Sequence, residues 1–210
     1  MTALLEAAAR PAYPATIALV LSNKAEAAGL ERARAAGIET AVIASKGKTR
    51  AGFEAEMTAT LAQARIEIIA LAGFMRVLTE EFVGPWAGRM LNIHPSLLPS
   101  FPGLDTHARA LEAGVRLHGC TVHLVTPGVD EGPILAQSAV PVLAGDTESS
   151  LGARVLEQEH RLYPAALAWL ASGKVRLEHG RAIVAANLAA GALANPLPEV
   201  APLRRDDQRI

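Results

Sequence analysis

Short apolar runs alternate with helical stretches along the first part of the chain. The apolar runs cover residues 15–21, 39–44 and 66–72, and the stretches between them, residues 25–36 and 50–63, have the composition of helices. A short run that is apolar throughout is typical of a strand buried on both faces. Strands that alternate with helices pair in parallel. The pattern therefore predicts an α/β fold with a doubly wound, mostly parallel sheet.

The second half of the chain predicts a long helix and a C-terminal antiparallel hairpin. Asp146 or Thr147 can cap a helix whose apolar side chains recur every three or four residues until a glycine ends it. Residues 175–184 then predict the hairpin. No linker divides the chain, so we expect one domain over residues 1–186. Residues 187–210 are rich in Ala and Pro, and we expect a loosely ordered tail there.

Composition and charge narrow the classes of function. The chain has 210 residues, a formal net charge of −1 and a single cysteine, Cys120. A nearly neutral chain has no long-range attraction for nucleic acid or an anionic membrane, and one cysteine forms no internal disulfide. No apolar run approaches the ~20 residues of a membrane span, and the start lacks the pattern of a signal peptide. We therefore expect a cytoplasmic enzyme that acts on small molecules.

Polar chemistry is concentrated between residues 89 and 133. Residues 89–95 (RMLNIHP) predict a short strand that Pro95 ends. Side chains alternate along a strand, so Asn92 and His94 share one face at its carboxyl end. Ligands bind at this edge of open α/β sheets. A carboxamide and an imidazole are therefore expected side by side at the rim, where His94 is either a catalyst or a structural histidine.

Two carboxylates occupy positions that favour a role beyond the surface. Asp130 lies in a glycine-flanked turn (GVDEGP), where the ordinary role of an aspartate is to form the turn. Glu159 falls on the apolar stripe of the long predicted helix, and a carboxylate on a buried face needs a partner or a function. It either pairs with an arginine or binds a ligand.

The strand end and the segments that follow it resemble the folate-dependent formyltransferases. The similar segments are NIHPSLLPSFPGLDTH at residues 92–107, HGCTVHLV at residues 118–125 and VDEGP at residues 129–133. The resemblance extends over most of the chain and implies the Rossmann-like sheet of that family. PGLDTH at residues 102–107 points to the branch that formylates phosphoribosylglycinamide, because transfer-RNA formyltransferases and folate hydrolases differ in this loop.

The resemblance implies a reaction and three catalytic residues. The formyl group of 10-formyltetrahydrofolate would pass to the amine of 5-phosphoribosylglycinamide in purine (IMP) biosynthesis. Asn92, His94 and Asp130 match the catalytic residues, and a carboxylate beside His94 would favour the charged imidazole. A carboxamide N–H and an imidazolium are suitable donors to the oxyanion of a tetrahedral intermediate. The imidazolium can also protonate the departing folate nitrogen.

Other positions match ligand-binding residues of the family. The folate-binding positions are Arg50, Met75, Arg76, Val77, Leu78 and Asn92, and Glu159 matches a glutamate that contacts the glycinamide substrate. Backbone groups of the loop after the third strand would bind the pterin edge, and the apolar side chains would pack on it. We expect no metal, because the histidines lack the spacing of a zinc site. The chain is expected to be a monomer or a homodimer.

One part of the family pattern has no counterpart in this sequence. Family members begin with an apolar strand and a loop rich in Gly and Ser, whose backbone N–H groups bind the substrate phosphate at a helix N-terminus. Here residues 1–5 (MTALL) already match the first helix. We therefore expect a domain without that strand and loop. Three hypotheses stay open: this formyl transfer, transfer to another amine or hydrolysis of 10-formyltetrahydrofolate, and a non-catalytic form that binds folate.

Overall fold

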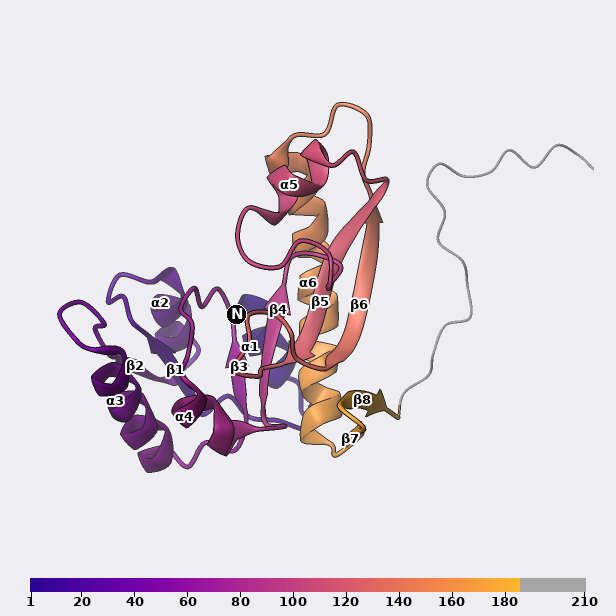
Figure 1. Ribbon diagram of the computed structural model, residues 1–210. Helices are drawn as coiled ribbons and strands as arrows, with labels where there is room; N and C mark the ends of the chain where they lie inside the picture. The colour runs from indigo at the N-terminus through magenta and orange to yellow at the C-terminus, as the bar shows by residue number, and fades with distance from the viewer. Residues whose placement is uncertain (186–210) are drawn as a thin grey trace, which may run out of the picture.

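The computed structural model describes residues 1–185, which fold into strands covered by helices (Figure 1). The helices are α1 (Thr2–Ala8), α2 (Ala28–Ala35), α3 (Arg50–Gln63), α4 (Glu80–Val83), α5 (Thr106–Glu112) and α6 (Glu148–Ala171), and a 3-10 turn, η1, covers Gly84–Trp86. The strands are β1 (Leu19–Ser22), β2 (Glu39–Val42), β3 (Ile69–Leu71), β4 (Met90–His94), β5 (Leu117–Leu124), β6 (Ile134–Pro141), β7 (Val175–Glu178) and β8 (Arg181–Val184). The tail expected over residues 187–210 lies outside the described residues, and the single domain over residues 1–186 stays a prediction.

The central sheet has four strands in the order β3-β4-β5-β6. β3 runs parallel to β4, whereas β4–β5 and β5–β6 are antiparallel pairs. β7 and β8 form a separate antiparallel hairpin. The predicted α/β class and C-terminal hairpin are therefore confirmed, with a central sheet that is mixed. The direction of the strands reverses at β5, after the Pro-rich loop and α5, and again at β6, which a turn joins to β5.

β1 and β2 form a two-stranded parallel sheet of their own. Within the described residues no ladder joins β1 to β3, although side chains of both strands pack against one apolar cluster that contains Phe53 and Met90. All four residues of β1 are half-buried, and Glu39 and Val42 at the ends of β2 are exposed. The expectation that both strands are buried on both faces is therefore wrong, because each has an edge without a partner. Whether a further strand belongs beside these edges stays a prediction.

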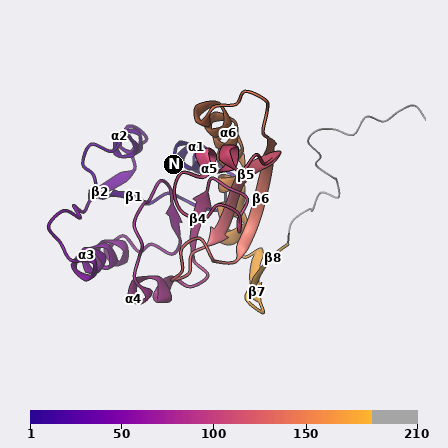
Figure 2. The ribbon, with the colours of Figure 1, turned by 45° about the horizontal axis from the view of Figure 1, so that its top comes forward.

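Successive residues of β4 face two different apolar clusters. Met90 packs with Phe53 of α3 and Phe82 of α4, whereas Leu91 packs with Leu4 of α1 and Tyr163 of α6. Figure 2 accordingly shows α4 and α6 on opposite sides of β3 and β4. The alternation of side chains along the strand therefore puts Asn92 and His94 on the α4 side of the sheet.

The long helix α6 begins and ends where the sequence predicted. Thr147 accepts a hydrogen bond from Ser150 N at 3.2 Å, and Ser150 Oγ accepts one from Thr147 N at 2.9 Å, which completes a capping box. Gly173 follows the helix with φ of 68°, in the left-handed region that favours glycine. α6 packs along β5 and β6 and contacts α1, so it supports the whole central sheet.

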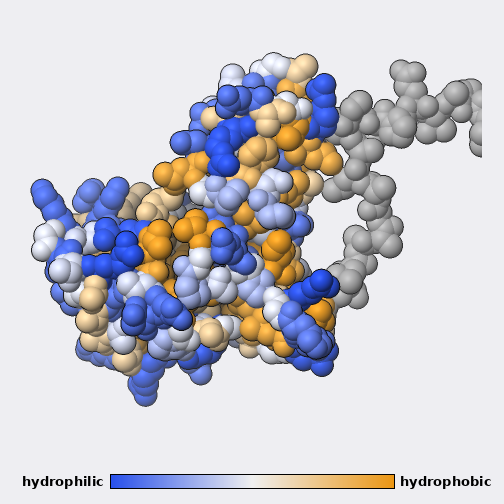
Figure 3. All heavy atoms as spheres, viewed as in Figure 1, coloured by the Kyte–Doolittle hydropathy of each residue, from blue (hydrophilic) through white to orange (hydrophobic). Residues whose placement is uncertain are grey.

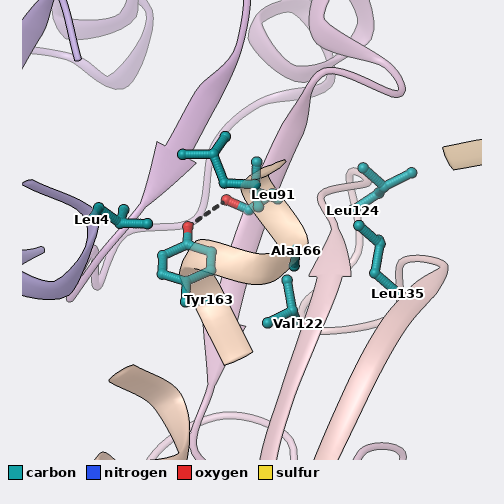
Figure 4. Close-up of a cluster of buried hydrophobic side chains, with 8 residues drawn as sticks. Leu4, Leu91, Val122, Leu124, Leu135, Tyr163 and Ala166 are labelled. Carbon is teal, nitrogen blue, oxygen red and sulfur yellow. Dashed lines mark hydrogen bonds between the residues drawn. The ribbon is translucent and has the colours of Figure 1, made fainter. Parts of the chain in front are cut away.

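Tyr163 of α6 ties the ends of β3 and β4 together. Its ring is 4% exposed, and its hydroxyl lies 2.6 Å from Leu71 O and 3.1 Å from Leu91 O (Figure 4). Burial raises the pKa of Tyr163 well above its usual value, so the hydroxyl keeps its proton as a donor. The two carbonyls directly precede the segments where ligand-binding residues were predicted, Ala72–Leu78 after β3 and Asn92 on β4.

Replacing Tyr163 by phenylalanine should lower the free energy of unfolding by about 1–3 kcal/mol, because the single O–H that the Leu71 and Leu91 carbonyls share is lost. Urea unfolding followed by circular dichroism measures the change. Tyr13→Phe is the matched control, since the Tyr13 hydroxyl donates to Pro164 O at 2.7 Å from a half-buried position. A loss no larger than that of the control would contradict the role given to Tyr163.

Candidate active site

The end of β4 brings Asn92 and His94 to the carboxyl rim of the sheet. Asn92 is paired in the ladder with His123 of β5, and His94 is paired with Thr121. On the other side of β4, Asn92 is the ladder partner of Leu71, the last residue of β3. His94 is buried, with 5% of its surface exposed. Asn92 and His94 therefore lie on β4, between β3 and β5, and share one face of that strand as predicted.

Asp130 lies beside His94. Its Oδ2 atom is 3.3 Å from His94 Nδ1 and accepts a hydrogen bond from Gly103 N at 2.9 Å. The turn that carries Asp130 is tight: Asp130 has φ of 55°, and a Cβ atom on Gly132 would lie 1.7 Å from Leu124 O. Glycine is thus required at position 132 so that the turn can close on β5. The Asp130 carboxylate therefore connects its own turn to the Pro-rich loop, at Gly103, and to β4, at His94.

Both ring nitrogens of His94 have a neighbouring oxygen atom. His94 Nε2 lies 2.9 Å from Phe101 O, and a carbonyl only accepts, so Nε2 carries a proton and donates. Nδ1 faces the Asp130 carboxylate, which also only accepts when ionised. The ring therefore lies between a carbonyl acceptor at Nε2 and a carboxylate near Nδ1.

His123 orients the Asn92 amide, a role that the sequence did not reveal. His123 Nδ1 is 3.0 Å from Leu124 O and therefore donates to it, which leaves Nε2 to accept from Asn92 Nδ2 at 3.3 Å. Burial lowers the pKa of His123, despite the opposing Leu124 carbonyl and Asp130 charge, and this matches a neutral ring. The hydrogen bond to His123 therefore fixes the orientation of the Asn92 amide. The alternation of Thr121 and His123 on β5 is the signal that could have identified this face.

Thr121 and Gln137 hold the loop that carries the Phe101 carbonyl. The Thr121 hydroxyl donates to Ser96 O at 2.7 Å and accepts from Leu98 N at 3.0 Å. The Gln137 amide donates to Leu98 O at 2.8 Å and to the Thr121 hydroxyl at 3.0 Å. Two strands thus fix the start of this loop behind His94.

The loop after β3 exposes apolar side chains at the same rim. Met75 is 77% exposed and Val77 is 51% exposed, whereas Leu78 is 8% exposed and packs in the core. Leu78 therefore offers a ligand less side-chain surface than Met75 or Val77, and the folate contact expected from Leu78 stays a prediction. Figure 3 shows apolar surface in the hollow between the end of the molecule that carries α5 and the end that carries α2 and α3.

The two arginines of the predicted folate site belong to one neighbourhood. The Arg76 guanidinium lies 5.1 Å from the ring centre of Phe53, in the first turn of α3. Arg50 begins α3 one helical turn before Phe53 and is exposed. Residues three apart on a helix share a face. The structure therefore brings Arg50 and Arg76 to the same side of α3, next to the exposed loop.

Glu159 faces a separate cavity on the α6 side of the sheet. The cavity measures about 340 Å³ and is lined by Met1, Ala3, Leu4, Ala72, Gly73, Ile93, Leu156, Glu159, His160 and Tyr163. Burial raises the pKa of Glu159, and the amino group of Met1 opposes this rise. The alternative of an ion pair with an arginine is not found for Glu159 among the described residues. A carboxylate in such a cavity suits a cationic or amine ligand.

A second cavity, of about 380 Å³, opens beside Asp130. Its walls come from Leu98, Pro99, Pro102, Val129, Asp130, Glu131, Gly132 and Ile134. Asp130 therefore has His94 on one side and an open, largely apolar hollow on the other.

His107 and His118 form a pair behind the Pro-rich loop. His107 Nδ1 lies 3.1 Å from His118 Nε2, and His118 is 1% exposed. Burial, with a smaller contribution from His107, lowers the pKa of His118 to about 4.

Residues 1–185 contain no group of three or more His, Cys, Asp or Glu side chains placed to hold a metal ion. In the same residues no helix is long and apolar enough to span a bilayer.

The lowered pKa of His118 in the His107–His118 pair predicts that the folded protein loses stability in acid. The pKa of His118 is lower in the folded chain than in the unfolded chain, so the unfolded chain binds the extra proton and stability falls as the pH drops below about 6.5. Between pH 7 and pH 4 the contribution is about 3 kcal/mol. The free energy of unfolding should therefore fall between pH 7 and pH 4 in both proteins, and the fall should be about 3 kcal/mol smaller in His118→Gln than in the wild type. Equal pH dependence in urea titrations would show that His118 is not kept neutral by the fold; His179→Asn in the exposed turn is the control.

Comparison with known proteins agrees with this site. A family described as formyl transferase matches residues 1–167. The phosphoribosylglycinamide formyltransferase of Escherichia coli (strain K12) is 45% identical over 183 residues, which are 87% of this chain and 86% of that protein. The trifunctional purine biosynthetic protein adenosine-3 of Bos taurus is 50% identical over 183 residues, which are 86% of this chain but 18% of that protein.

Solved structures show the same relationship. Glycinamide ribonucleotide transformylase 1 from Symbiobacterium toebii superposes with a TM-score of 0.84 and is 44% identical, with 87% of this chain and 86% of that chain covered. Phosphoribosylglycinamide formyltransferase from Brucella melitensis is 57% identical, with a TM-score of 0.78 over 81% of this chain and 88% of that chain. The matches cover most of the sequence and include the strand end, the Pro-rich loop and the Asp130 turn. The chain therefore belongs to the formyl transferase family.

Proposed function

We propose that this chain transfers the formyl group of 10-formyltetrahydrofolate to the amine of 5-phosphoribosylglycinamide, a step of purine biosynthesis. The observation that carries the proposal is the placement of His94 between the Asp130 carboxylate and the Phe101 carbonyl, with the Asn92 amide on the same strand face. The names of the E. coli and Brucella relatives support the choice of acceptor. A single buried cysteine, Cys120, suits a reducing compartment and supports a cytoplasmic location.

The proposed chemistry needs donors for a developing negative charge. The amine nitrogen of the acceptor attacks the formyl carbon and forms a C–N bond, and the carbonyl electrons move to oxygen. The bond from the formyl carbon to the folate nitrogen then breaks; the amine loses a proton and the folate nitrogen gains one. The Asn92 amide is proposed to donate a hydrogen bond to the oxyanion. The His94 imidazolium stabilises the same charge, and its Nε2–H is proposed to exchange Phe101 O for the substrate.

The folate is proposed to bind along the loop after β3. Exposed Met75 and Val77 offer apolar contact, and the backbone of Leu78 offers hydrogen bonds. The guanidinium groups of Arg50 and Arg76 suit the carboxylates of the folate tail. Glu159 is proposed to contact the glycinamide substrate away from its reacting amine, because its cavity is on the α6 side of the sheet and Asn92 and His94 are on the α4 side.

A coupled assay with the purified chain tests the function. Phosphoribosylglycinamide and 10-formyltetrahydrofolate are supplied together, and the formylated product and tetrahydrofolate are quantified by mass spectrometry. Equal amounts of both products are expected. Formate released without the amine would instead indicate a hydrolase, and formylation of a different amine would change the proposed acceptor. Folate binding without turnover would support the non-catalytic alternative and contradict the proposal.

A further inference from the structure

α3 buries a carboxylate on its apolar face. Glu54 is 5% exposed and lies among Phe53, Met57 and Leu61, the buried side chains of the helix. Its Oε1 atom accepts a hydrogen bond from Thr79 N at 2.9 Å, and its Oε2 atom accepts one from the Thr79 hydroxyl at 2.5 Å. A buried carboxylate is costly unless hydrogen bonds satisfy it. Both carboxylate oxygens of Glu54 accept hydrogen bonds from the same residue, Thr79.

Thr79 is the end of the exposed loop that follows β3. Its hydroxyl also accepts a hydrogen bond from Phe82 N at 3.3 Å and so caps α4. One residue before Glu54, the ring of Phe53 lies under the Arg76 guanidinium. α3 therefore supports this loop at two points, in its middle at Arg76 and at its end at Thr79.

The exposed residues between these points need a fixed backbone to bind a ligand. Met75 and Val77 are mostly exposed, so packing of their own side chains does not hold them. A site is precise when residues behind it hold the backbone in the binding conformation. Glu54 is the buried group that reaches this backbone directly, at Thr79 N.

We propose that Glu54 is a positioning residue for the folate co-substrate: it holds Thr79 and thereby shapes the loop of residues 73–78 for binding. The inference rests on the proposed function, because it takes this loop to be the folate site. Glu54 contacts no reacting atom in this scheme. Its loss should therefore affect folate binding and leave the chemical step and the binding of the amine substrate intact.

Steady-state kinetics separate this role from a general loss of structure. Glu54→Ala should raise the KM for 10-formyltetrahydrofolate about tenfold, equivalent to about 1.4 kcal/mol. The kcat at saturating folate and the KM for phosphoribosylglycinamide should stay within about twofold, since Asn92, His94 and Glu159 are on other elements. Glu56→Gln is the matched control: Glu56 is on the same helix, exposed, and paired with Lys48 at 2.5 Å. It should keep the wild-type constants.

Conservative variants and direct binding complete the test. Glu54→Gln retains an acceptor for Thr79 N and should show an intermediate KM. Thr79→Val removes the hydroxyl donor and should raise the folate KM about threefold, whereas Thr79→Ser should restore it. Calorimetric titration with tetrahydrofolate, together with thermal unfolding, reports binding and folding separately.

Two results would overturn the inference. One is an unchanged folate KM in folded Glu54→Ala or Thr79→Val protein. The other is a parallel change of both KM values and kcat, which would mark Glu54 as a general structural residue. If the wild type binds tetrahydrofolate and Glu54→Ala binds it equally well, the inference alone fails. A wild type that does not bind tetrahydrofolate overturns the proposed function together with it.

Discussion

Replacing His94 or Asn92 by alanine is expected to lower kcat for formyl transfer by about 10²–10³-fold, the usual cost of one donor to an oxyanion. Both side chains lie on the α4 face of β4, at the rim of the sheet. His94→Ala removes the ring that lies between Asp130 and Phe101 O. Asn92→Ala removes the amide that His123 orients. The KM for folate should change less than kcat, because most of the expected folate positions, Arg50 and residues 75–78, are untouched.

Rates at saturating substrates and calorimetric titration with tetrahydrofolate check both parts of this expectation. Because His94 is buried, His94→Gln is included as a variant that preserves volume, and thermal unfolding confirms that each protein is folded. His179→Asn is the control: His179 is exposed in the β7–β8 turn with φ of 50°, which asparagine tolerates. Near-normal turnover in a folded His94 or Asn92 variant would remove that residue from the catalytic site.

The second large effect is expected for Asp130→Asn, with a fall in kcat of about 10²–10⁴-fold, the range of general acid–base catalysis. The asparagine carbonyl can still accept the hydrogen bond from Gly103 N, so the loop should keep its position. The same oxygen position, Oδ2, also faces His94 Nδ1, so this contact keeps its acceptor and loses its negative charge. A neutral neighbour stabilises the imidazolium less than a carboxylate does, and this weakens the stabilisation of the oxyanion.

Nitrogen NMR of the His94 ring in the two proteins measures this change directly. At the same pH, Nδ1 of the His94 ring should be less protonated in Asp130→Asn than in the wild type, because the neighbouring negative charge is gone. Glu131→Gln is the matched control, because Glu131 is the exposed neighbour on the same turn. The same protonation state in both proteins, or the same loss in the control, would mean that Asp130 acts in another way.

Local patterns in the sequence were sufficient for the elements and for part of the site. Asn92 and His94 share a face because side chains alternate along a strand, and Pro95 puts them at its end. Thr147 and Gly173 delimit α6 because capping is a local interaction. The exposure of Met75 and Val77 also agrees with their place in a loop directly after a strand. Each of these features depends on neighbours within a few residues.

The local sequence patterns did not predict which residues far apart in the chain contact one another. The bond between His123 and Asn92 appears only once the β4–β5 register is known. The Leu78 side chain lies in the core because α3 and α4 pack around it. The contact of Glu54 with Thr79 likewise depends on the packing of α3 against the start of α4. Register and packing decide such contacts, and they involve residues far apart in the chain.

The sequence by itself determined the α/β class, the C-terminal hairpin and the strand end that carries Asn92 and His94. The tertiary structure decided which groups meet there: the Asp130 carboxylate against His94 Nδ1, the Phe101 carbonyl against Nε2, and the separation of β1–β2 from the central sheet. The physical reason is the range of the interactions. Capping, side-chain alternation and chain breaking act over one or two turns, whereas the charge and hydrogen bonding of His94 depend on a turn and a loop that are placed by pairing with β5 and β6.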